Sequence, residues 1–212
     1  MTFYINFASI LFSLIVDNTQ TYTKNQLDKL GNTLIYLCTH IDSASKTHLL
    51  KLVFIIEEIA VKKFGVPFFN LRFDVWKLGP VSRDLFVELS GETNLLSKYI
   101  KKGGGAESQK ILPNQAFSDD EFSDNEIKLL EEIVDRFKYC TANELINYTH
   151  RKNTPWYNTA QKHGVLDSLE SGNMTTTDFE IDLSEIIQDD KVKMNLYNSF
   201  KEYFNQSKSL KS

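Results

Sequence analysis

The sequence is short of cysteine, and this scarcity excludes one class of protein. Only Cys38 and Cys140 are present among 212 residues, too few for a small domain held together by disulfide bonds. A reducing cytoplasm is therefore the expected compartment. Recognisable catalytic motifs are missing as well: there is no nucleophile elbow, no zincin histidine pair and no dinucleotide-binding glycine fingerprint. We therefore expect no enzyme, no catalytic residue and no cofactor.

The sequence also lacks an excess of positive charge and a long apolar run. The balance of 24 basic against 28 acidic residues gives a net charge of −4, which disfavours binding to nucleic acid or to anionic lipid. The apolar stretch 3–16 is interrupted by polar residues and is too short to span a bilayer. No positive charge precedes it, as a secretory signal would require. It is interpreted as a short amphipathic element, or a start-site extension, that docks on this chain or on a partner.

Histidine is scarce too, and its four positions do not indicate a metal site. Cys38 and His40 lie too close together for the usual zinc-ligand spacing, and no second pair accompanies them. Two roles are open for His150, which lies between two short predicted helices. It could serve as a general base, although no carboxylate or nucleophile is indicated as its partner. Alternatively, its ring nitrogens could link the two helix ends.

What the sequence does contain is a series of helices with clear start signals. The strongest runs from Lys46 to Phe64 and is apolar over most of its surface, which predicts the central core helix. Gly65 is placed to end it, and Ser43 or Ser45 to begin it. The other predicted helices are 23–40, one opened by the capping box at Ser123, one opened by the capping box at Thr141, one opened by Thr154-Pro155, and 192–204.

The stretch from Asn70 to Leu89 predicts a change from strand to helix. Apolar residues alternate with a period of two as far as Trp76, which is typical of a strand. Gly79-Pro80 is expected to end the strand, and a helical apolar period begins at Val81. The sequence leaves open whether Trp76 is a core anchor or a side chain held rigidly at a surface.

The remaining segments give weaker patterns. Residues 101–105 are expected to form a mobile loop because of three consecutive glycines, and 164–177 another loop. Residues 110–113 could form an edge strand that pairs with 71–76. The overall prediction is a mainly α (α+β) fold, a compact multi-helix domain around a central core helix. We divide the chain into an extension (1–26), one domain (27–205) and a frayed tail (206–212).

Several motifs, in order and spacing, resemble the SocA-like antitoxin family, also called the Panacea domain. The resemblance covers roughly residues 27–204, and no single motif in it is strong alone. Val75, Leu78 and Phe86 depart from the usual family residues, but the swaps are compatible with a core. The extension before Leu27 lies outside it. The matching motifs are Lys51-Leu52-Val53-Phe54, Phe64-Gly65-Val66-Pro67, Trp76-Lys77-Leu78-Gly79-Pro80-Val81, Leu85-Phe86, Leu145 to His150, and Pro155-Trp156.

The resemblance implies an antitoxin without enzymatic activity that neutralises a co-encoded toxin by direct binding. Two alternatives stay open: an adaptor that delivers the toxin to a cellular protease, and a DNA-binding transcriptional regulator. The cognate toxin is the expected partner, nucleic acid and membrane are not, and the oligomeric state is not indicated. Residues 90–120 and 3–16 would add partner-specific contacts. The residues expected to bind the partner are Trp76, Lys77, Gly79, Pro80, Val81, Arg83, His150 and Trp156.

Overall fold

Most of the described elements are helices, and the strands among them are short and form two antiparallel hairpins, which confirms the mainly α (α+β) fold class. The computed structural model describes residues 22–42, 44–91, 95–105 and 110–209. The described elements are α2 (Lys24–His40), α3 (Lys46–Phe64), β1 (Asp74–Trp76), β2 (Gly79–Val81), α4 (Arg83–Ser90), β3 (Ile100–Lys102), β4 (Ile111–Pro113), α5 (Asp124–Phe137), α6 (Ala142–Thr149), α7 (Pro155–Lys162), α8 (Leu166–Glu170), the 3-10 helix η2 (Leu183–Ile187) and α9 (Lys191–Ser209).

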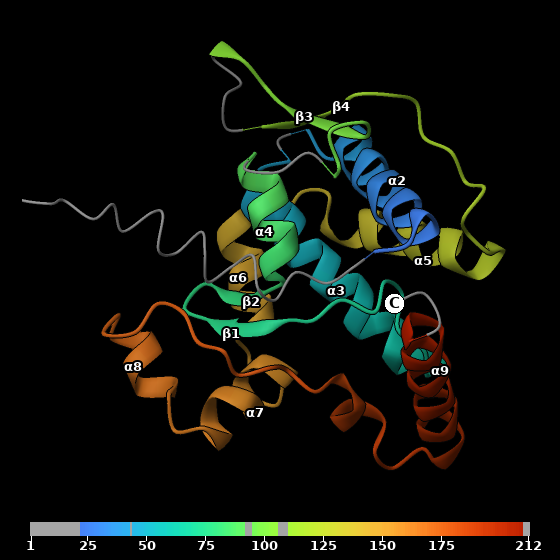
Figure 1. Cartoon of the computed structure of the whole chain (residues 1–212). Coiled ribbons are helices and arrows are strands. Elements are labelled where there is room, and N and C mark those ends of the chain that lie inside the picture. Colours follow the sequence, from blue (N-terminus) through green and yellow to red (C-terminus); the bar gives the residue numbers. More distant parts are fainter. Residues whose placement is uncertain (1–21, 43, 92–94, 106–109, 210–212) are drawn as a thin grey trace, which may run out of the picture.

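Helix α3 is the element on which the others pack, as the sequence predicted. It runs through the middle of the molecule and contacts α4, α5, α6, α9, η2 and β2 (Figure 1). Its buried side chains point in every direction around the helix, because nearly the whole stretch from Leu49 to Val61 is apolar. Two buried residues on α3 are ionisable, Lys51 and Glu57. Lys51 reaches strand β2, and Glu57 reaches the loop that follows α3.

The predicted helix starts are confirmed by their capping contacts. The Thr23 side chain accepts a hydrogen bond from the Gln26 backbone N–H, and Ser45, Thr141 and Thr154 cap α3, α6 and α7 in the same way. Gly65 ends α3 in the left-handed conformation, with φ of 72°. These signals are local, and each of them places its helix correctly.

The strand-to-helix prediction at Gly79-Pro80 is wrong in two respects. Gly79-Pro80 does not end the strand but forms β2, which pairs with β1 in an antiparallel hairpin whose turn is Lys77-Leu78. Proline is tolerated there because it pairs with Val75 and its missing N–H faces away from β1. Helix α4 begins only at Arg83, two residues after the predicted start.

The strand pairing of 110–113 and of 71–76 differs from the prediction, and so does the segment 164–177. Strand β4 pairs with β3 and not with 71–76, so Lys101 and Lys102 belong to a strand and not to a loop. The partner of 71–76 is instead the distant segment 175–181: Val75 N–H donates to the Phe179 carbonyl, and an isolated bridge joins Asp74 to Glu180. The predicted loop 164–177 contains α8.

The last helix is confirmed and extends beyond its predicted end at residue 204. Helix α9 extends to Ser209 and buries Tyr197, whereas Leu196 and Tyr203 are exposed. Cys38 and Cys140 are free thiols, as expected. No helix within the described residues has both the length and the apolar composition to cross a membrane. The expectations for 3–16 and most of 1–26 concern residues outside the described ranges.

Candidate functional site

The hairpin β1–β2 is held along both of its edges. On the β1 side, Lys77 N–H donates to the Thr175 carbonyl (2.9 Å) and Val75 N–H to the Phe179 carbonyl (3.0 Å). The Thr177 hydroxyl donates to the Val75 carbonyl (2.6 Å). The segment 175–181 therefore closes the edge of β1, and an edge closed in this way offers no free backbone groups to another strand.

On the β2 side, the partner is a lysine. The Lys51 Nζ donates to the Pro80 carbonyl at 2.9 Å, from a side chain that is only 1% exposed. The Pro80 carbonyl is free to accept because β2 lies at the edge of the sheet and Pro80 pairs with Val75, whose own N–H and carbonyl face the 175–181 segment. Burial lowers the pKa of Lys51 to about 7.

Gly79 brings three elements into close contact. Its φ is +96°, which favours glycine, and a Cβ at this position would lie 2.8 Å from the Thr149 hydroxyl oxygen and 3.1 Å from Lys51 Nζ. Strand β2, helix α3 and helix α6 therefore meet at this glycine. No larger residue fits without a shift of the neighbouring groups.

Trp156 and His150 form the next layer below the hairpin. The indole N–H of Trp156 donates to the Trp76 carbonyl (3.0 Å), and the His150 ring stacks on Trp156 with centroids 3.8 Å apart. Burial, and after it the charge of Lys51, lower the pKa of His150 to about 4. His150 is therefore neutral near pH 7. Its buried Nε2 has no hydrogen-bond partner among the described residues.

Arg83 and Asp74 join the hairpin to the start of α4. Asp74 is buried and accepts hydrogen bonds from Arg72 Nε (3.0 Å) and Arg83 Nε (2.5 Å). Arg83 also donates to the Thr177 carbonyl (2.8 Å) and pairs with Asp178. Its guanidinium is thus already used within the chain, and it fixes α4 against the segment that closes β1.

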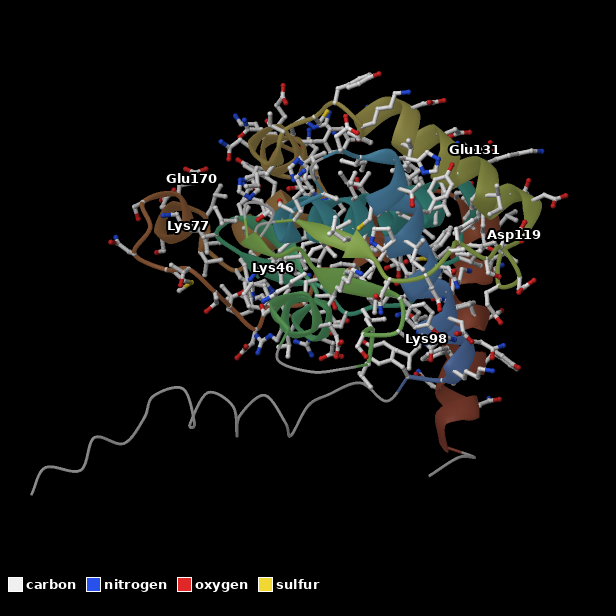
Figure 2. All side chains as sticks on the ribbon, turned by 90° about the horizontal axis from the view of Figure 1, so that it is seen from above. Lys46, Lys77, Lys98, Asp119, Glu131 and Glu170 are labelled. Atoms are coloured by element: carbon white, nitrogen blue, oxygen red, sulfur yellow. The ribbon has the colours of Figure 1, made fainter. Side chains whose placement is uncertain are left out.

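The turn of the hairpin is the part that reaches the surface. Leu78 is 55% exposed, and Trp76 and Lys77 are half-buried. The Trp76 ring meets Phe86 edge-on (5.2 Å), and Lys46 lies 3.8 Å above the Phe86 ring. Figure 2 shows Lys77 at the same end of the molecule as Glu170 of α8, opposite the end that carries Asp119 and Glu131. We call Trp76, Lys77 and Leu78 the turn surface.

The structure brings most of the expected partner-binding residues together, but in two layers. Trp76 and Lys77 belong to the turn surface, and Arg83 and His150 are half-buried close to it. Gly79, Pro80, Val81 and Trp156 are buried and support the hairpin from within. Sequence reasoning missed Lys51 and Leu78. The signal for Lys51 was a lone cation within the apolar core helix.

The described residues offer no site for a metal ion, because no group of three or more His, Cys, Asp or Glu side chains lies close enough to hold one. The site therefore consists of a stiff backbone turn with an apolar tip, supported by a buried lysine, a neutral histidine and a buried indole. Such an arrangement can present a fixed shape to another molecule.

A family model matches the part of the chain that contains the hairpin and its supporting residues Lys51, His150 and Trp156. The family model of the SocA-like antitoxin, Panacea domain, matches residues 49–157, just over half of the chain. The matched range begins in α3 and ends in α7, so it contains Lys51, the whole hairpin, His150 and Trp156. Searches of curated proteins and of solved structures found no match. The chain belongs to the family of SocA-like antitoxins with a Panacea domain.

Proposed function

We propose that this protein is a cytoplasmic antitoxin that neutralises a co-encoded protein toxin by binding it directly, without catalysis. The observation that carries the proposal is the turn surface. Leu78 is exposed at the tip of a hairpin whose two edges are bonded to other parts of the chain. An exposed apolar side chain on a rigid backbone loses little conformational entropy on binding, which suits it to anchor a partner.

The expected partner-binding residues then divide by role. Trp76 and Lys77, together with Leu78, which was not among the expected residues, would contact the toxin, with His150 and Arg83 at the margin. The buried residues Gly79, Pro80, Val81 and Trp156 would hold the backbone that presents them. This division explains how a motif that is mostly buried can still determine a binding surface.

The proposal is tested by co-expressing the protein with the product of the adjacent gene and scoring cell growth. The wild-type chain should restore growth, and Leu78→Glu should abolish the rescue, because a charge replaces the apolar tip. Leu196→Glu is the matched control: Leu196 is similarly exposed (48%) but lies on α9, away from the turn. Both variants should melt within a few degrees of the wild type.

Three results would contradict the proposal: an adjacent gene product that is harmless alone, one that is equally toxic with and without this protein, or full rescue by Leu78→Glu. The variant Trp76→Ala is a second test of the turn surface. Trp76 is half-buried, so its removal should lower the melting temperature less than removal of Trp156 does while still weakening binding.

A further inference from the structure

We infer that Lys51 is a positioning residue for the turn surface: its ammonium group holds the β2 backbone in the conformation that presents Trp76, Lys77 and Leu78. The biological meaning of this inference rests on the proposed function. Its physical content, a buried cation that immobilises one hairpin, is tested on the protein alone.

Lys51 lies where α3, β2 and α6 meet. Its Nζ donates to the Pro80 carbonyl of β2, and its Cε and Nζ lie against Gly79, at the position where the Thr149 hydroxyl of α6 also lies. The hairpin is bonded on its β1 side by the 175–181 segment. On its β2 side, Lys51 is the described donor to the Pro80 carbonyl. Without the ammonium group, that carbonyl would lose its donor and the outer side of β2 would be released.

A stability role does not account for this residue. An ammonium group has three N–H donors, and the described structure gives this one a single hydrogen bond, to Pro80. Burial of a charge with so few partners is unfavourable, and an apolar side chain of the same length is commonly neutral or stabilising at such a position. The lowered pKa of Lys51 agrees with that penalty. The ammonium therefore contributes to the geometry of the hairpin and not to the stability of the fold.

The test compares Lys51→Met with the wild type by hydrogen exchange and thermal melting. Methionine keeps the length of the side chain and fills the same space, but it has no N–H donor. Amides of residues 74–82 should exchange at least tenfold faster in the variant, while those of α5 are unchanged. The melting temperature at pH 6 should equal or exceed that of the wild type, because the buried charge is gone. Lys62→Met, an exposed lysine of the same helix, should change neither quantity.

Two results would overturn the inference. Unchanged exchange in the hairpin would show that Lys51 does not immobilise it. A variant that is unfolded, or that exchanges faster throughout the chain with a lowered melting temperature, would show that Lys51 only stabilises the fold.

A binding measurement adds the functional consequence. Calorimetric titration with the purified product of the adjacent gene should show at least tenfold weaker binding by Lys51→Met than by the wild type. Binding as tight as that of the wild type, despite a loosened hairpin, would overturn the positioning role. If the wild type itself does not bind that product, the proposed function fails, and the exchange data still decide whether Lys51 immobilises the hairpin.

Discussion

Lys51 and Glu57 are buried ionisable residues of the same helix, but the two regions that they reach are built differently. Each side chain is only 1% exposed. Glu57 accepts three backbone hydrogen bonds, from Phe68 N–H (2.8 Å), Phe69 N–H (2.7 Å) and Leu71 N–H (3.2 Å). Lys51 donates one hydrogen bond, to the Pro80 carbonyl. The carboxylate is well satisfied, whereas the ammonium is not.

The surroundings of Glu57 also differ from those of Lys51. Beside Glu57, Asn70 adopts a left-handed conformation (φ 58°) and accepts a hydrogen bond from Lys201 Nζ of α9 (2.6 Å). A surface cavity of about 440 Å³ lies there, lined in part by Glu57, Tyr197 and Lys201. Burial raises the pKa of Glu57, although its three donors and Lys201 act in the opposite direction. This region fixes the chain after α3, and the Lys51 region shapes a surface.

The largest loss of stability should come from removing the Glu57 carboxylate, which has more hydrogen bonds than the Lys51 ammonium. Glu57→Leu would leave three buried N–H groups without an acceptor, so the free energy of unfolding should fall by roughly 3–5 kcal/mol. Glu57→Gln keeps one oxygen and should lose about half as much. Urea denaturation measures both. The exposed residue Glu131 of α5 supplies the control Glu131→Gln, which should stay within about 0.5 kcal/mol of the wild type. A Glu57→Leu variant as stable as the wild type would show that the Glu57 carboxylate, like the Lys51 ammonium, does not stabilise the fold.

An intermediate effect is expected at Gly79, in the Lys51 region. Gly79→Ala places a Cβ against Thr149 and Lys51 at a φ of +96°, so the free energy of unfolding should fall by about 2 kcal/mol. Adding Thr149→Ser to Gly79→Ala would not relieve the contact, because the hydroxyl remains. Adding Thr149→Ala should recover part of the lost free energy of unfolding. Chemical denaturation of the three variants separates the contact from the backbone strain. Equal losses with and without the Thr149 hydroxyl would show that only the backbone matters.

The smallest effect is a dependence on pH caused by His150. Its pKa is about 4 in the folded chain and about 6.5 when unfolded, so the folded state resists protonation. Its contribution to stability is complete above pH 6.5 and is lost as the pH falls from 6.5 to 4. After a discount for partial exposure, the loss should be about 1–2 kcal/mol.

The comparison of wild type with His150→Phe isolates this contribution. Phenylalanine keeps a ring against Trp156 but cannot titrate, and Glu57 titrates in both chains. The difference in unfolding free energy between the two proteins, measured from pH 4 to pH 7, should therefore change over that range. A constant difference would show that His150 titrates normally in the folded chain.

The helices could be predicted from the sequence because their signals are local. Thr23, Thr141 and Thr154 cap helices through contacts three residues away, and Gly65 ends α3 through its own φ. The role of Gly79-Pro80 could not be predicted in this way. Their position in a second strand depends on Lys51, 29 residues earlier in the chain, and on the 175–181 segment, about 100 residues later.

The same reasoning applies to the candidate site. The sequence identified the motif around Trp76 but left open whether this indole is a core anchor or a side chain held at a surface. In the structure Trp76 is half-buried, whereas Trp156 is 2% exposed. Lys51 was noted only as part of a family motif and not as a site residue, because helical periodicity treats a lone lysine on an apolar face as an interruption. Its importance comes from a contact made in three dimensions.

The closure of β1 by residues 175–181 has a consequence for the timing of synthesis. A nascent chain that has emerged through Val81 contains both hairpin strands and Lys51, but it lacks the segment that bonds to β1. About 100 further residues must be translated before that edge is covered, which takes roughly 5–20 s at usual elongation rates. During this interval the β1 edge of the hairpin would lack its hydrogen-bond partners in the 175–181 segment. Under the proposed function, protection against a toxin made at the same time would therefore lag behind translation of the motif itself.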